Sequence, residues 1–184
     1  MRVAPLVAMA VIGTLSACGS MSPSSMSSAA MSQVALPEAV RVPTGQKVAM
    51  ETVGVGEITY ECREKQGAMG QYEWFFVGPD AMLMDRNGKQ VGRYFGPPAT
   101  WQSSDMSAVT ATQVAVAPAG TGNIPLQLVK ANPATGNGAM TGVSYIQRLA
   151  TKGGVAPMST CAADARGKRE IVKYQADYIL WKPM

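Results

Sequence analysis

The chain has 184 residues, no histidine and a formal net charge of +4 at pH 7. Its Lys and Arg residues are scattered, apart from the small cluster Arg166, Lys168 and Arg169, so it lacks the basic stripe with interleaved aromatic residues that nucleic-acid binding requires. The absence of histidine also excludes the common nucleophile and base pairs of hydrolases and histidine-containing zinc sites.

The chain begins with the features of a bacterial lipoprotein signal. Arg2 supplies a positive charge, and residues 3–15 form an apolar stretch too short to be a permanent membrane span. The sequence Leu15-Ser16-Ala17-Cys18 then resembles a lipobox, so we expect residues 1–17 to be removed and Cys18 to carry the lipid anchor. Because Gly19 rather than Asp follows, the resemblance to sorted lipoproteins favours the periplasm-facing side of the outer membrane.

Residues 18–35 follow as a segment of Ser, Ala and Met, whose composition predicts a flexible tether. Met21, Met26 and Met31 offer thioethers that could suit Cu(I), but they are widely spaced and no histidine accompanies them, so we expect no metal and no cofactor. Residues 36–184 are long enough for a single domain with one hydrophobic core.

Strands are predicted throughout this domain. Apolar and polar residues alternate over residues 58–63 and 172–180, and Asn87-Gly88 predicts a tight hairpin between strands at 81–85 and 90–95. Further strands are expected at 72–77, 108–117, 125–131 and 141–149, separated by Gly, Pro and Asn. About eight or nine short strands without a helical periodicity predict an all-β fold, a single antiparallel β-sandwich or barrel.

Two cysteines remain once Cys18 is acylated. An even pair in an oxidising compartment predicts a disulfide between Cys62 and Cys161. The alternative, a catalytic thiol, lacks a histidine to act as its base.

A series of short motifs then occurs in a fixed order along the domain. The motifs are Tyr60-Glu61-Cys62, Trp74-Phe75-Phe76-Val77-Gly78-Pro79, Asp85 with Gly88, Val91-Gly92, Gly96-Pro97, Trp101, Ile124-Pro125, Tyr145-Ile146-Gln147-Arg148-Leu149, Gly153-Gly154-Val155-Ala156-Pro157, Cys161 and Tyr174-Gln175-Ala176-Asp177-Tyr178. In this order they resemble a family of secreted bacterial and fungal domains known only as a domain of unknown function, over about Leu36 to the C terminus. The resemblance implies no established activity.

Fungal members of that family are often labelled malate dehydrogenase, and the sequence argues against this activity. Such an enzyme needs a Gly-x-Gly-x-x-Gly turn that opens a helix, and a catalytic histidine. The nearest matches, at residues 54–56 and 120–122, open no helical pattern. Many members also carry a histidine before a Tyr-x-Gly-Pro segment, which this chain has at residues 94–97 without any histidine.

Carboxylates are the remaining catalytic groups. A glycosidase needs two of them about 5 to 10 Å apart, one with a raised pKa. The candidates are Glu61, Glu73, Asp105 and Asp177, of which Glu61 and Asp177 lie on predicted strands opposite the apolar face. Ordinary solvated strand positions would give the same pattern.

Three further residues are candidates for ligand binding. Gln147 and Arg148 place a polar side chain on each face of one strand, so either could line a cleft where the guanidinium binds a carboxylate or phosphate. Alternatively, Arg148 pairs with an internal acid such as Asp177 and fixes the strand register. Trp101 lies in a Gly/Pro-rich stretch and is expected to be exposed, where it could stack on a sugar.

These observations favour a membrane-anchored envelope lipoprotein that acts as a non-catalytic structural or ligand-binding module. Its partner beyond the membrane would be a glycan, a small ligand or an envelope protein. The alternative is a carboxylate-dependent hydrolase of envelope glycans. A close acid pair in a cleft beside Trp101 would favour the hydrolase, whereas a closed, side-chain-filled core with an apolar patch would favour a structural or partner-binding role.

Overall fold

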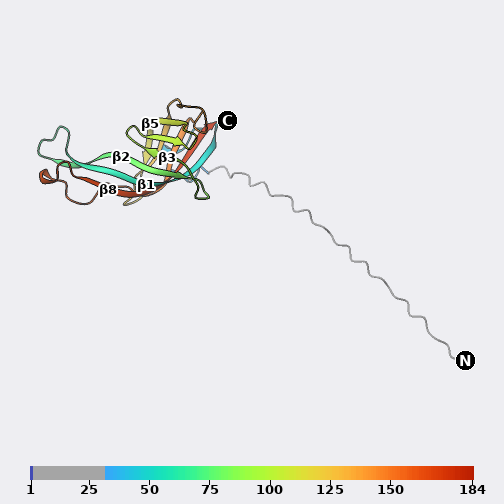
Figure 1. Ribbon diagram of the computed structural model, residues 1–184, viewed down its shortest axis with the longest axis horizontal. Coiled ribbons are helices and arrows are strands. Elements are labelled where there is room, and N and C mark those ends of the chain that lie inside the picture. Colours follow the sequence, from blue (N-terminus) through green and yellow to red (C-terminus); the bar gives the residue numbers. More distant parts are fainter. Residues whose placement is uncertain (2–31) are drawn as a thin grey trace.

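The structure is a computed structural model that describes Met1 and residues 32–184 (Figure 1). The predicted signal peptide, Cys18 and most of the predicted tether lie outside these residues. The described part contains the short 3-10 helices η1 (Glu38–Val40) and η2 (Ala163–Ala165) and eight strands, so the all-β prediction is confirmed. The strands are β1 (Gln46–Glu64), β2 (Tyr72–Met84), β3 (Gln90–Phe95), β4 (Thr100–Ser103), β5 (Ala108–Ala117), β6 (Leu126–Ala131), β7 (Tyr145–Gly153) and β8 (Arg169–Pro183).

The strands form one closed antiparallel barrel. Each strand pairs with the next in the chain, and β8 returns to pair with β1. Of the two architectures that the sequence left open, the structure is therefore the barrel rather than the sandwich. Across residues 32–184 no helix has both the length and the hydrophobicity needed to cross a bilayer.

The barrel interior is filled by side chains from all around the wall. Alternation along β1 directs Ile58 and Tyr60 inward, and they join a core whose largest fully buried members include Trp101, Tyr178 and Leu83. Such close filling leaves the interior as a packed core of the kind found in small barrels.

Two glycines in β1 permit this packing. A Cβ on Gly54 would lie 2.5 Å from the Tyr178 ring, and a Cβ on Gly56 would lie 2.2 Å from the carbonyl oxygen of Asp80. The Gly-x-Gly sequence at residues 54–56 is therefore a site of close strand packing in the middle of β1, and no helix follows it. The second match, at residues 120–122, lies between β5 and β6.

A second apolar cluster lies on the outer wall of the barrel. Leu36, Val40 and Val42 cover the outward-facing side chains of β6, β7 and β8, including Ile179 and Trp181. The segment that enters the domain is thus part of the fold.

The strand boundaries agree with the sequence-based prediction at one hairpin and differ from it elsewhere. The hairpin at Asn87-Gly88 is confirmed: Gly88 has a φ of 81°, and the Asp85 carboxylate accepts hydrogen bonds from the backbone N–H groups of Asn87 and Lys89. The predicted strands at 72–77 and 81–85 are one strand, β2, which continues through Gly78 and Pro79. The four-residue strand β4 was not predicted.

Three strands extend beyond the rest of the barrel. The pairing of β3 with β2 stops at Asp80, and the pairing of β7 with β8 stops at Tyr174, whereas β1 continues to pair with both β2 and β8. We call this extension the arm: residues 57–64 of β1, 72–79 of β2 and 169–173 of β8, with the loops 65–71 and 154–168. In Figure 1 the arm projects from one end of the molecule.

Candidate functional site

Trp101 is buried, so the prediction of an exposed sugar platform is wrong. Only 2 % of the residue is exposed. Its indole stacks on Tyr94 at a centroid distance of 4.5 Å and meets the Tyr178 ring edge-on at 5.8 Å. The short strand β4 directs it into the barrel, where it belongs to the core, and its Nε1 has no hydrogen-bond partner among the described residues.

Gln147 is also a structural residue. Its side chain is fully buried on the outer wall beneath the segment that enters the domain. Its amide donates to the carbonyl oxygen of Val40 at 2.6 Å and to the Gln33 side chain at 2.8 Å, and its oxygen accepts the Trp181 indole N–H at 2.9 Å. Gln147 therefore fastens this segment to the barrel rather than lining a cleft.

Arg148 does not pair with Asp177 as one interpretation expected. Its Nε donates to the carbonyl oxygen of Pro125 at 3.0 Å. In the pairing of β7 with β8, Arg148 lies opposite Tyr178. The Arg148 charge reaches the buried tyrosines of the core, where burial raises the pKa of Tyr94 and Arg148 opposes that rise. Arg148 thus borders a cluster of neutral phenols.

The predicted carboxylates do not form a glycosidase pair. Asp177 lies opposite Val53 on β1, and Glu61 lies eight residues further along that strand, about 26 Å away at the usual rise of a strand. Asp177 accepts a hydrogen bond from Arg86 at 2.9 Å, and the same guanidinium contacts Glu51 at 3.2 Å. Asp177 and Glu51 therefore share one cation, Arg86, on the outer wall.

Two of the remaining candidate acids, Glu61 and Asp105, are held in structural hydrogen bonds. Hydrogen bonds from Arg63 and Arg169 lower the pKa of Glu61, the opposite of the shift that a general acid needs. The Ser107 hydroxyl, with the backbone N–H groups of Ala139 and Ser107, lowers the pKa of Asp105 from 3.8 to about 2. Glu73 is exposed on β2 in register with Arg63. Within the described residues no three His, Cys, Asp or Glu side chains gather into a metal site.

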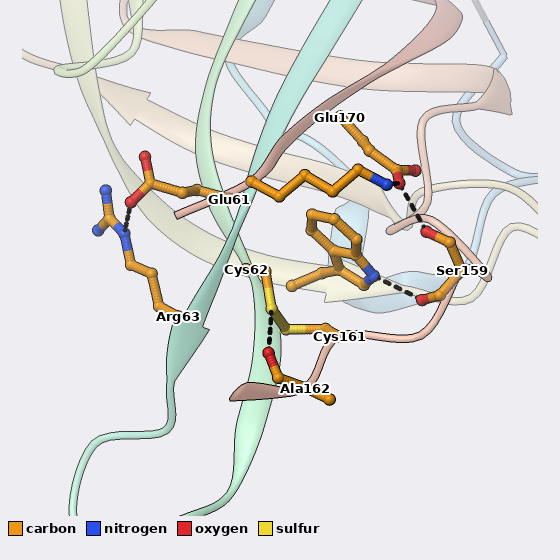
Figure 2. Close-up of a disulfide and its surroundings, with 9 residues drawn as sticks. Glu61, Cys62, Arg63, Ser159, Cys161, Ala162 and Glu170 are labelled. Carbon is orange, nitrogen blue, oxygen red and sulfur yellow. Dashed lines mark hydrogen bonds and ion pairs between the residues drawn. A yellow bond between two sulfur atoms is a disulfide. The ribbon is translucent and has the colours of Figure 1, made fainter. Parts of the chain in front are cut away.

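The arm is held rigid by covalent and polar contacts. The predicted disulfide between Cys62 and Cys161 is confirmed, and it ties the loop 154–168 to β1 (Figure 2). Close by, the Trp74 indole donates to the carbonyl oxygen of Ser159 at 2.8 Å, and the Ser159 hydroxyl donates to Glu170 at 2.9 Å. The loop is thus fixed at both its backbone and its side chains.

This rigid arm exposes large apolar side chains. Phe75 is 45 % exposed and Phe76 is 49 % exposed, although they are neighbours on one strand and point to opposite faces. The Arg63 guanidinium lies 4.4 Å from the centre of the Phe75 ring, and Tyr60 meets Phe76 edge-on at 5.9 Å. The other exposed apolar residues of the arm are Met69, Val155, Met158 and Ile171.

A groove of about 560 Å³ lies where the arm joins the barrel. Val55 and Met82, both partly exposed, form its apolar floor. Its acidic rim residues have cationic partners: Glu57 pairs with Lys173, and Asp80 pairs with Arg93 at 3.0 Å. Apolar surface bordered by neutralised charges is suited to binding rather than to acid catalysis.

The exposed aromatic surface of the arm was not predicted, although the sequence contains a signal for it. The run Trp74-Phe75-Phe76-Val77 is apolar without alternation, which is typical of a strand buried on both faces. In the arm the same run lies outside the barrel. Its three consecutive aromatic residues, in a domain whose other strands alternate, are the signal that could have indicated an exposed surface.

Fold and surface together define a small all-β domain: a closed barrel with a filled interior and a disulfide-bonded arm that exposes aromatic residues. The chain belongs to the family described as "Protein of unknown function (DUF3455)", whose model matches residues 43–182. The resemblance seen in the short motifs is therefore confirmed. Comparisons with curated proteins and with solved structures gave no match.

Proposed function

We propose that this protein is an envelope lipoprotein, anchored through Cys18 to the periplasm-facing side of the outer membrane, that binds a macromolecular partner through its arm. The barrel acts as a non-catalytic scaffold. One contrast supports this proposal above all: aromatic and aliphatic side chains pack the barrel interior, yet the large aromatic side chains of Phe75 and Phe76 remain exposed on the arm. Exposed apolar side chains on a rigid element are typical of an interaction surface.

The filled interior argues against a small ligand inside the barrel. Trp101, Tyr178 and Leu180, each at most 2 % exposed, occupy the space where larger barrels hold their ligands. Burial raises the pKa of Tyr178 and Tyr174, so the phenols stay neutral at physiological pH. A neutral, closely packed interior stabilises the folded barrel.

The position of the entering segment is compatible with an anchored protein whose arm is accessible. Gln33 contacts Gln147, which lies opposite Ile179 on β8, eight residues from the exposed Ile171 of the arm. This separation corresponds to about 26 Å along the strand. The point at which the entering segment contacts the barrel is thus well separated from the arm.

The hydrolase alternative has less support. Glu57 and Asp80 are cross-strand partners that border the groove, but each has a cationic partner. A glycosidase needs a carboxylate pair that faces its substrate, whereas both of these carboxylates contact cations.

Site-specific photo-crosslinking in cells tests the proposal. A photoreactive phenylalanine analogue at Phe75 is compared with the same analogue at Val114, which is 54 % exposed on β5, away from the arm. We expect a macromolecular adduct at position 75 and none at 114. Equal labelling at both positions, or no adduct at Phe75, Phe76 or Ile171, would contradict the proposal.

A further inference from the structure

The outer edge of β2 in the arm has no pairing strand within the described part of the chain. Residues 72–84 of β2 pair with β1 on one side, but β3 covers the other side only from Asp80 onward. Gly78 packs against Gly96, and the Gly96 N–H donates to the carbonyl oxygen of Pro79, so the uncovered edge comprises residues 72–77, which present alternate N–H and C=O groups outward. An uncovered edge of this kind is a template for another strand.

The sequence of this edge makes it suited to pairing. The run from Tyr72 to Phe76 contains four aromatic residues and a single charge, Glu73. Natural edges are usually protected by lysine, proline or a bulge. In the pairing of β2 with β1 there is a bulge between Thr59 and Tyr60. Both this bulge and Pro79 lie outside the run 72–76, so residues 72–76 pair regularly with β1.

We propose that two copies of this protein pair through the β2 edge, antiparallel about a two-fold axis centred on Trp74 or Phe75. This inference rests on the proposed function, because it names the partner of the arm as a second copy. The three arm strands of each copy would then form one continuous sheet across the dimer.

Self-complementarity favours a second copy as the occupant. An axis at Phe75 places Phe75 opposite Phe75 and Trp74 opposite Phe76 of the second copy, whereas an axis at Trp74 places Tyr72 opposite Phe76 and Glu73 opposite Phe75. Neither register brings the two Glu73 carboxylates face to face. Since residues 72–77 carry no other charge, like charges do not oppose each other along the edge.

The arm carries six acidic and six basic residues, so its formal charges balance. Glu61, in register with Phe75 on β1, accepts hydrogen bonds from Arg63 and Arg169, both at 2.7 Å. Two arms can therefore approach without strong repulsion. The edge is short, so the interface falls at the small end of specific interfaces and the dimer should dissociate on dilution.

Sedimentation velocity of the full-length lipoprotein in mild detergent measures the assembly. We expect a concentration-dependent dimer for the wild type and for the control Val114→Lys, and a monomer for Phe75→Lys, which introduces the residue that natural edges use for protection. The disulfide and the melting temperature should be unchanged in Phe75→Lys. A wild type that stays monomeric throughout a dilution series, or a dimer that survives Phe75→Lys, would overturn the inference.

Cysteine trapping in intact cells tests the same pairing independently, in the membrane and without detergent. Phe75→Cys or Trp74→Cys should give a covalent dimer on a non-reducing gel, because opposed Cβ atoms in a strand pair are close enough for a disulfide, and Val114→Cys should not. The mass of the position-75 photo-adduct separates the two proposals. Twice the mass of the chain supports the dimer, another mass overturns the dimer but retains the binding arm, and no adduct refutes both.

Discussion

Removal of the disulfide should cost this domain a large part of its stability. Cys62 and Cys161 are separated by 99 residues, so the bond closes a loop that contains most of the barrel. In the chain-entropy model a loop of this length contributes about 4.7 kcal/mol by restricting the unfolded chain. For a domain of this size, where each kcal/mol moves the melting temperature by about 2 to 4 °C, the expected fall is roughly 10 to 20 °C.

Equilibrium urea unfolding of the wild type and of Cys62→Ala/Cys161→Ala measures this contribution. The reduced wild type is the matched control, since it keeps both sulfur atoms and separates the lost cross-link from the small cavity that alanine leaves at the buried Cys62. Both reduced and substituted proteins should lose similar stability. A loss below about 1 kcal/mol in the reduced protein would refute the entropic argument.

Three further predictions each concern a single residue. Trp101→Ala should lower the free energy of unfolding by about 3 to 5 kcal/mol, because it opens a cavity between Tyr94 and Tyr178; a loss under about 1 kcal/mol in urea unfolding would show that the indole is not core. The pKa of Asp105 is depressed from 3.8 to about 2, so its stabilising effect is complete above pH 3.8 and is lost as pH falls through 2. Thermal melts should therefore show a steeper loss of stability across that range for the wild type than for Asp105→Asn, and parallel curves would contradict the assignment. Cys18→Ser should abolish labelling by a radioactive fatty acid and release the protein from the outer-membrane fraction, whereas retained label would disprove the anchor.

Sequence periodicity predicted most of the fold because the barrel has one buried face. Alternation identified the strands around Ile58 and Tyr178, and Asn87-Gly88 located a hairpin, since both signals are local. Closure into a barrel could not be predicted in the same way. It depends on the pairing of β1 with β8, which brings together residues from opposite ends of the domain.

The candidate site was harder to predict than the fold. The Gly and Pro residues that flank Trp101 predict a loop and therefore an exposed side chain, whereas the four-residue strand β4 is too short to show a period. Gln147 was considered as a ligand residue because its hydrogen-bond partners, Gln33 and Trp181, are distant in sequence. The exposure of Phe75 follows from the length by which β1, β2 and β8 exceed their neighbours, which no local pattern encodes.

Native mass spectrometry of the protein, released from envelopes in mild detergent, tests the central claim that the arm binds while the barrel is only a scaffold. We expect the covalent mass of the chain to be lowered by the two hydrogen atoms lost in the disulfide and raised by the lipid on Cys18. The only non-covalently bound mass should be a polypeptide partner, which Phe75→Lys removes and Val114→Lys preserves. Retention of a small molecule by the wild type and by Phe75→Lys alike would contradict the account, because the ligand would then bind independently of the exposed aromatic residues of the arm.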